Sequence, residues 1–307
     1  MKAVFVDAGD ELGDIMQRLI RPSDLAVTIH RDADVQPEAL PGIVGDAEIA
    51  IVDHTAFPTE IAARCPALRH VVFLGTGARS YMNPEELAER GIAVHIIKGY
   101  GDTAVAECAI ALMWAAAKGL AAMDRGMRAG QWLRMEGMQL TGKTLGLIGF
   151  GGIAAEVARM AAGMGMTVLA WNRTARSHPG VTFTDLDTLI AQSQVVSLHL
   201  LLTDETRGFL SAERIAAMRP GVILVNTARG ALVDEAAMIA ALRSRRIGHA
   251  GLDVFTTEPL PADHPLTGLP NVTLSAHSAF RTPEASDNLI EAALGHCRRI
   301  AAVAQDL

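Results

Sequence analysis

Short apolar runs alternate with amphipathic stretches through the first hundred residues, and turn residues separate the two kinds of segment. Runs rich in β-branched residues and leucine are typical of buried strands, whereas the stretches between them have helical spacing. The predicted strands in this part of the chain are residues 4–6, 26–29, 49–52, 71–74 and 93–97. Strands that alternate with helices indicate a parallel α/β architecture.

A long alanine-rich stretch follows and predicts one helix from about Thr103 to Arg128. This helix is apolar on nearly every side as far as Lys118, so we expect it to be buried at a domain junction or a subunit interface.

A second alternation of strands and helices begins after Gly142, and a last helix is predicted over residues 283–303. From local patterns alone, one boundary near residue 140 would divide the chain into two α/β units. The predicted strands of the second alternation are residues 144–148, 167–171, 195–199, 222–226, 249–252 and 272–274.

Composition and charge exclude several classes of protein. Of the 307 residues, 50% are hydrophobic and 20% are charged, which is typical of a globular chain of about two domains rather than a disordered one. The net charge of −7 (27 − 34) and the absence of a basic run disfavour binding to nucleic acid or to an anionic membrane. The longest apolar stretch, residues 109–117, is too short to span a bilayer.

The cysteines and histidines do not suggest a metal site or disulfides. Cys65, Cys108 and Cys297 lie far apart in the sequence, which indicates buried thiols in a reducing compartment. The histidines have no paired spacing typical of metal ligands. We therefore expect no bound metal. No targeting segment is visible at the N-terminus, so we expect a cytoplasmic protein.

A glycine-rich turn follows the predicted strand at 144–148 and opens an alanine-rich helix. Gly149 allows the tight turn, Gly151 lets the backbone approach a pyrophosphate, and Ala154 keeps helix and strand close. The amide N–H groups at the start of the helix, around Gly152 and Ile153, would face the diphosphate. Such a motif alone is a weak indicator because glycine turns are common, but its position between strand and helix favours dinucleotide binding over a purely structural turn.

The position that recognises the adenosine ribose lies about 20 residues further on, at the end of the next strand. An acidic residue is usual there in NAD enzymes, but this chain has Asn172, Arg173 and Thr174. Arg173 can bind a 2′-phosphate through two hydrogen bonds, and Thr174 can donate another, so the sequence favours NADP(H). Alternatively, Arg173 stacks on the adenine and the site takes NAD(H).

Three polar residues with complementary chemistry follow separate predicted strands. Arg229 comes after strand 222–226, Glu258 comes after strand 249–252, and His277 comes after strand 272–274. Each alone could be an ordinary turn or surface residue. Because parallel strands end at the same edge of a sheet, the three can converge. Together they provide a guanidinium for a carboxylate, a carboxylate partner and an acid/base.

With these motifs in their order, the chain resembles the D-isomer-specific 2-hydroxyacid dehydrogenase family over essentially its whole length. The resembling segments are Gly75-Thr76-Gly77, residues 91–94, 105–107, 130–132 and 142–146, the glycine motif, residues 196–199, 226–230, 233–235 and 253–255, and His277.

The resemblance implies two Rossmann-like or flavodoxin-like parallel-sheet domains with the active site in the cleft between them. Residues 1–98 plus 282–307 would form the substrate domain, and residues 99–281 would form the dinucleotide-binding domain. It also implies a homodimer built on the cofactor domain, which would account for the apolar helix after Thr103.

The resemblance further implies a role for each residue. Arg229 would bind the substrate, Glu258 would favour the protonated form of the imidazole, and His277 would be the acid/base. The backbone N–H groups of Thr76 and Gly77 would hold the carboxylate. Further residues implied at the cofactor are Thr227, Ala228, Asp253 and His277.

The expected activity is hydride transfer between NAD(P)H and a small 2-oxo acid, as in glyoxylate or hydroxypyruvate reductases. The alternative is a dinucleotide-sensing protein, similar to corepressors of the same fold, with little turnover. Arg79 stands two residues after Gly77, where an Asp is usual in the family, and is either a determinant for anionic substrates or a solvated surface arginine. Ser278-Ala279-Phe280 replaces a glycine-rich turn, so we expect a different pocket wall.

Overall fold

The computed structural model describes residues 1–305 and divides the chain into two compact units. The terminal unit comprises Met1–Gly101 and the C-terminal segment from Arg281, whereas the central unit comprises Asp102–Phe280. A single boundary near residue 140 is therefore wrong, because that position lies inside the central unit. The local pattern misplaced the boundary because the apolar helix before it packs on the central unit's own sheet.

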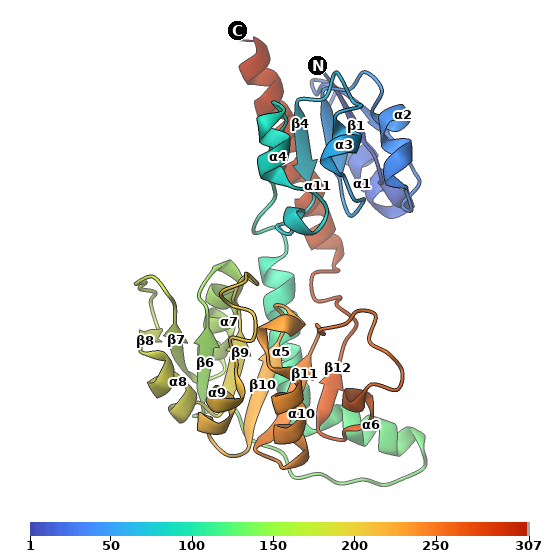
Figure 1. Ribbon diagram of the computed structural model, residues 1–307. Helices are drawn as coiled ribbons and strands as arrows, with labels where there is room; N and C mark the ends of the chain where they lie inside the picture. The colour runs from blue at the N-terminus through green and yellow to red at the C-terminus, as the bar shows by residue number, and fades with distance from the viewer. Residues whose placement is uncertain (306–307) are drawn as a thin grey trace. The chain divides into compact units, whose positions relative to one another are not determined.

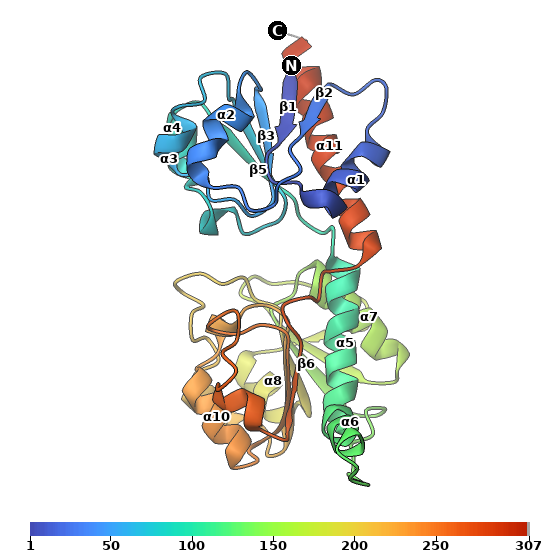
Figure 2. The ribbon, with the colours of Figure 1, turned by 90° about the vertical axis from the view of Figure 1, so that its right-hand side faces the viewer.

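The terminal unit is built on a parallel five-stranded sheet in the order β2-β1-β3-β4-β5. One apolar cluster covers one face with residues from α2, α3 and α4, and a second cluster covers the other face with α1 and α11 (Figure 2). The strands are β1 Lys2–Phe5, β2 Ala26–Ile29, β3 Ile49–Val52, β4 His70–Phe73 and β5 Ala93–Ile96. The helices are α1 Gly9–Leu19, α2 Leu40–Val44, α3 Thr59–Ala62, α4 Pro84–Glu89 and α11 Pro283–Gln305, with 3-10 turns η1 Pro37–Ala39 and η2 Ala78–Ser80.

The central unit has a parallel seven-stranded sheet in the order β12-β11-β10-β9-β6-β7-β8 (Figure 1). Helices α5 and α7 cover one face, and α8, α9 and α10 contribute to the apolar core on the other. The strands are β6 Thr144–Ile148, β7 Thr167–Trp171, β8 Thr182–Phe183, β9 Val195–Leu198, β10 Val222–Asn226, β11 Ile247–Leu252 and β12 Val272–Leu274. The helices are α5 Asp102–Lys118, α6 Leu120–Arg128, α7 Gly152–Gly163, α8 Leu186–Gln192, α9 Ala212–Ala217 and α10 Glu235–Arg243, with 3-10 turns η3 Gly230–Leu232 and η4 Pro265–Gly268.

The alanine-rich stretch after residue 102 forms two helices instead of the single predicted one. The chain bends by 67° between α5 and α6, at Gly119. Gly119 has φ +64°, a left-handed conformation that favours glycine and ends α5 directly after Lys118. The alanine-rich pattern extends across this position without interruption, so it did not reveal the bend.

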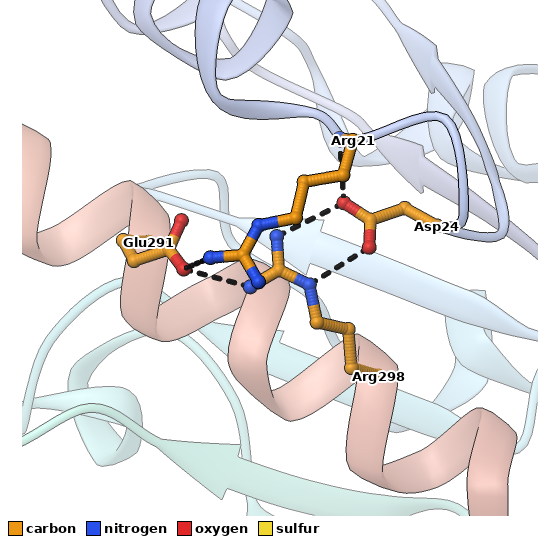
Figure 3. A network of polar contacts seen from close by, with 4 residues as sticks. All are labelled: Arg21, Asp24, Glu291 and Arg298. Carbon is orange, nitrogen blue, oxygen red and sulfur yellow. Dashed lines mark hydrogen bonds and ion pairs between the residues drawn. The ribbon is translucent and has the colours of Figure 1, made fainter.

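An ion-pair network joins the N-terminal and C-terminal segments of the terminal unit (Figure 3). Arg298 on α11 binds Asp24 through Nε and Nη2, at 2.8 and 2.9 Å. Glu291 Oε1 accepts hydrogen bonds from Arg298 and from Arg21, each at 2.7 Å. Arg298 holds the pKa of Asp24 down at about 2. Helix α11, far away in sequence, is thereby tied to the loop before β2.

Within residues 1–305, no single helix is both long and apolar enough to cross a membrane. Helices α5 and α6 satisfy length and composition only when they are taken together across their bend. In the same range, no group of three His, Cys, Asp or Glu side chains is arranged to hold a metal ion.

Candidate active site

The three predicted catalytic residues follow adjacent strands of the central sheet. Strands β10, β11 and β12 lie side by side and are parallel, so their carboxyl ends meet at one edge (Figure 1). Arg229 follows β10, Glu258 lies in the segment after β11, and His277 follows β12. The sheet therefore places all three segments at the same edge.

His277 and Glu258 form a direct pair. Nδ1 of His277 lies 2.6 Å from Oε2 of Glu258, and the side chains are 37% and 33% exposed. The other carboxylate oxygen of Glu258 accepts a hydrogen bond from the Phe255 amide at 2.8 Å, which fixes the carboxylate. His277 has φ +48° and its amide donates to the Asp253 carbonyl at 2.8 Å, so its backbone is also held. No partner of the His277 Nε2 is described among residues 1–305, so this nitrogen of the half-exposed imidazole is available to a reacting group.

Asp253 is fully buried directly after β11, and its carboxylate organises the segment that carries His277. Oδ1 accepts hydrogen bonds from the Ser275 hydroxyl at 2.6 Å and the Ser278 amide at 3.1 Å. Oδ2 accepts one from the Ala279 amide at 3.0 Å. The sequence suggested contact with the cofactor for Asp253, which stays a prediction. Because its hydrogen bonds hold residues on both sides of His277, Asp253 positions the segment that carries the imidazole.

The turn that carries Arg229 is held by a buried amide that the sequence did not single out. Asn226 accepts from the Ala228 amide at 3.0 Å and donates to the Arg229 carbonyl at 2.9 Å. Gly230 packs so closely on the segment after β11 that an added Cβ would lie 2.0 Å from the Phe255 carbonyl carbon. The turn is thereby pressed against the segment that leads to Glu258. The Arg229 side chain is exposed and donates to the Ala228 carbonyl at 2.6 Å.

The glycine motif forms the predicted turn between β6 and α7. Gly149 has φ +90°, and an added Cβ would lie 2.7 Å from the His199 carbonyl oxygen. A Cβ on Gly151 would meet nothing within 4 Å, so the space above this residue is open. An added Cβ on Gly152 would lie 1.7 Å from Oδ2 of Asp102, at the start of α5. Burial, followed by the charge of Glu156, raises the pKa of Asp102.

Two observations show that these residues fit a dinucleotide. The first amide N–H groups of α7 have no acceptor within the helix and lie beside the open space at Gly151. The hydroxyl of Thr227, at the carboxyl end of β10, is buried and has no hydrogen-bond partner among residues 1–305. A buried polar atom without a partner is costly, and a bound ligand would satisfy it. Ala228, beside it, is half-buried.

At the end of β7, Asn172 connects the glycine turn to the segment that follows β7. Its Oδ1 accepts from the Phe150 amide of the glycine turn at 3.1 Å, and its Nδ2 donates to the carbonyl and hydroxyl oxygens of Thr174 at 2.9 and 3.0 Å. Arg173 is 80% exposed and pairs with Glu205 at 2.9 Å. The sequence did not indicate Glu205, because it lies 32 residues further along the chain.

The predicted substrate loop belongs to the terminal unit and follows β4. Among residues 1–305, no acceptor is described for the amide N–H groups of Thr76 and Gly77, which are therefore available to a carboxylate. Arg79 is 74% exposed and forms a bidentate ion pair with Glu85 at the start of α4. Arg79 thus has a partner within its own unit.

Comparison with known proteins identifies the family. The D-isomer specific 2-hydroxyacid dehydrogenase, NAD binding domain, family matches residues 110–279. A hydroxypyruvate reductase of Blautia hydrogenotrophica is 33% identical over 264 residues, which are 82% of each chain. The chain belongs to the D-isomer specific 2-hydroxyacid dehydrogenase family. A glyoxylate reductase of Korarchaeum cryptofilum is 38% identical over 242 residues, 76% of this chain and 73% of the relative.

Among solved structures, an acyclic imino acid reductase in complex with NADPH and D-Arg is similar to this dehydrogenase, with a TM-score of 0.85 and 27% identity. The similarity covers 98% of this chain and 97% of the other. The family and the two parallel-sheet domains predicted from the sequence are confirmed. The protein is an oxidoreductase that uses a nicotinamide dinucleotide on 2-oxo or 2-hydroxy acids.

Proposed function

We propose that this dehydrogenase reduces a small 2-oxo acid, of the glyoxylate or hydroxypyruvate class, with NADPH. The observation that carries the proposal is the 2.6 Å contact between His277 Nδ1 and Glu258 Oε2. An imidazole held by a carboxylate on one nitrogen is oriented to donate or accept a proton through the other. Relatives that carry the names hydroxypyruvate reductase and glyoxylate reductase support the choice of substrate.

In the proposed mechanism, the residues of the chain bind the acid and move one proton. Arg229 binds the carboxylate or carbonyl of the acid and offsets the negative charge that develops on the carbonyl oxygen. His277 gives its proton to that oxygen from Nε2, and Glu258 stabilises the protonated imidazole. The hydride for C2 comes from the nicotinamide dinucleotide when it is bound. In the reverse direction, His277 accepts the proton from the hydroxyl group.

The two units have different proposed tasks. The terminal unit would bind the acid, with the free amide N–H groups of Thr76 and Gly77 as donors to its carboxylate. The central unit would bind the dinucleotide through Gly149, Gly151, Gly152 and Ile153, and Thr227, Ala228 and Asp253 would lie near the nicotinamide end. The unpartnered Thr227 hydroxyl and the open space at Gly151 support this assignment.

The preference for NADP(H) rests on the end of β7. No carboxylate stands at residues 172–174, and the exposed Arg173 can reach a 2′-phosphate. Asn172 is engaged with Phe150 and Thr174, so its proposed contribution is to hold Arg173 and Thr174 in place. The similar imino acid reductase was solved with NADPH, which supports the same preference.

An absorbance assay tests the proposal. Oxidation of NADPH, and separately of NADH, is followed with glyoxylate, hydroxypyruvate, pyruvate and a phenyl-substituted 2-oxo acid. We expect rapid turnover of the small acids with a higher kcat/KM for NADPH. Binding of dinucleotide without turnover of any acid would contradict the proposed reaction and would support a dinucleotide sensor. The relatives are named as reductases, so they favour the enzyme over the sensor.

We also propose that the enzyme is a cytoplasmic homodimer. Helix α6 and the segment after it expose large apolar side chains, a pattern typical of an interaction surface. These residues are Leu120, Met127, Trp132, Leu133 and Met135, with exposures of 50, 51, 79, 44 and 36%. The three free cysteines support a reducing compartment. Sedimentation of Trp132→Ser beside the wild type tests the dimer, which should dissociate at higher concentration in the variant.

A further inference from the structure

An ion pair connects the two strand ends that flank the glycine turn. Strand β6 carries this turn at its carboxyl end and lies between β7 and β9 in the sheet. Arg173 comes two residues after β7, and Glu205 lies in the segment that follows β9. Nη1 of Arg173 lies 2.9 Å from Oε2 of Glu205. Residues 172–174, at the end of β7, include no acidic side chain, but Glu205 from a distant segment brings a carboxylate to this position.

A ring contact also joins the segment after β9 to the end of β7. The ring of Trp171, the last residue of β7, contacts the ring of Phe209 at a centroid distance of 5.2 Å. Within the segment that carries Glu205, the Thr206 hydroxyl donates to the Leu201 carbonyl at 2.7 Å and accepts from the Thr203 amide at 2.7 Å. The backbone at Glu205 is thus fixed within reach of Arg173.

The side chains of Arg173 and Glu205 are both exposed. Arg173 is 80% exposed and Glu205 is 78% exposed, so water solvates both partners. An ion pair of this kind contributes little to stability and exchanges readily for another partner. A phosphate dianion is a stronger partner for a guanidinium than a single exposed carboxylate, because it carries more negative charge.

We propose that Glu205 is a specificity-determining residue that competes with the 2′-phosphate of NADP(H) for Arg173. The proposal rests on the proposed binding of that phosphate by Arg173. When the phosphate binds, Arg173 must leave Glu205, whose carboxylate then lies close to a second anion. NAD(H) has a hydroxyl in place of the phosphate and leaves the pair intact. Glu205 therefore weakens the binding of NADP(H) selectively and brings the affinities for the two dinucleotides closer together.

Calorimetric titration with dinucleotide fragments tests the proposal without turnover. The probes are 2′,5′-ADP, which carries the 2′-phosphate, and 5′-AMP, which lacks it. The variant Glu205→Gln removes the competing charge and keeps the length of the side chain. We expect it to bind 2′,5′-ADP about threefold to tenfold more tightly, as is reasonable for exposed charges, and to bind 5′-AMP with unchanged affinity.

Asp204→Asn provides the matched control. Asp204 is the exposed neighbour of Glu205 and has no ion pair among residues 1–305, so this variant makes the same change in net charge one position away. We expect Asp204→Asn to change the affinity for 2′,5′-ADP by less than about twofold. Equal tightening in both variants would show a general charge effect and would overturn the competition for Arg173.

Arg173→Ala separates the two proposals. If Arg173 binds the phosphate, this variant loses about tenfold or more in affinity for 2′,5′-ADP, and the further change Glu205→Gln then has little effect. Unchanged affinity in Arg173→Ala would contradict the proposed phosphate site itself. Weakened binding in Arg173→Ala combined with no effect of Glu205→Gln in the wild-type background would overturn only the role of Glu205.

Discussion

His277 and Glu258 are 19 residues apart in sequence, and their side chains meet with Nδ1 and Oε2 2.6 Å apart. The two residues come from segments that follow neighbouring parallel strands, and each segment has its own internal support. Glu258 is held by the Phe255 amide, and the His277 segment is held by the buried carboxylate of Asp253. The contacts that hold the pair therefore all come from the central unit.

Replacing Glu258 by Gln removes the anion beside the imidazole and keeps the shape of the side chain. The imidazole loses the carboxylate that orients it for proton transfer, so reduction of the 2-oxo acid should slow by about 10- to 100-fold. Steady-state kinetics with glyoxylate and hydroxypyruvate measure this loss. A variant whose kcat/KM equals that of the wild type would contradict the role of Glu258.

His277→Ala removes the acid/base itself. We expect turnover to fall by about 10²- to 10⁴-fold, whereas the affinity for 2′,5′-ADP stays within about twofold, since this ligand lacks the nicotinamide. Activity close to that of the wild type would remove His277 from the mechanism. Loss of 2′,5′-ADP binding would instead indicate a disturbed fold, which circular dichroism can detect.

Gly230→Ala tests the close packing between the turn of Arg229 and the segment that leads to Glu258. The added methyl group would lie 2.0 Å from the Phe255 carbonyl carbon, so the two backbone segments must separate. We expect a loss of about 1–3 kcal/mol in the free energy of unfolding and a strong loss of kcat/KM. Gly268→Ala, which has nothing within 4 Å of the added Cβ and, like Gly230, no positive φ, is the control for a methyl group added without the close contact.

The buried His249 should make the stability of the central unit depend on pH. Its side chain is buried at 6% exposure and contacts the Thr273 hydroxyl at 3.0 Å. Burial, with smaller effects of Arg245 and Arg125, lowers the pKa of His249 to about 4. The folded protein therefore binds fewer protons than the unfolded chain, and the contribution of His249 to stability is complete above about pH 6.5 and is lost as the pH falls toward 4.

The measurement is urea unfolding of the wild type and His249→Gln at pH 7 and pH 5. The three tryptophans, Trp114, Trp132 and Trp171, all belong to the central unit, so their fluorescence reports on that unit. The wild type should lose on the order of 2 kcal/mol more than the variant between these two pH values. His199, whose pKa burial also lowers to about 4, remains in both proteins. Equal losses would contradict the assignment to His249.

Arg298→Met should loosen the attachment of α11 within the terminal unit. The change leaves Asp24, whose side chain is only 4% exposed, without its bidentate partner. We expect a loss of about 2 kcal/mol in local stability, measured by hydrogen exchange in peptides from β1, β2 and α11. The pKa of Asp24 is lowered to about 2, so the wild-type contribution is present above about pH 3.8 and is lost as the pH falls through 2.

Arg299→Met is the matched control for this measurement. Arg299 is the exposed neighbour of Arg298 and has no ion pair among residues 1–305. Faster exchange in both variants would show that the loss of any arginine on this part of α11 is sufficient, and the ion pair with Asp24 would then have no special role.

Much of the local structure could be predicted from the residues. The strands at 49–52, 144–148, 167–171 and 222–226 have the predicted limits, because continuous apolar runs are typical of strands buried on both faces. The strand at 26–29 also has the predicted limits, although it is an exposed edge strand. The short edge strand β8, Thr182–Phe183, was missed, since two residues cannot show a periodic pattern. The bend at Gly119 was missed for the opposite reason, because apolar spacing continues across it.

The family motifs predicted a set of site residues, but not what most of them contact. The resemblance supplied Arg229, Glu258, His277 and the glycine turn, each from a short local pattern. It did not indicate that the side-chain amide of Asn226 holds the turn of Arg229. It also did not indicate that the Asp253 carboxylate accepts hydrogen bonds from Ser275 and from the two backbone amides after His277. These positioning roles depend on partners more than 20 residues away or on exact backbone geometry.

The sequence by itself determined the parallel α/β class, the glycine turn between β6 and α7, and the chemical types of the residues proposed for catalysis. Periodicity and short motifs encode these properties within a few neighbouring residues. Only the tertiary structure decided the close packing of Gly230 on Phe255, the hydrogen bond between Asp253 and Ser275, and the pairing of Arg173 with Glu205. Each of these brings together segments distant in the chain, and the order of strands in a sheet, rather than their order in sequence, sets which segments meet.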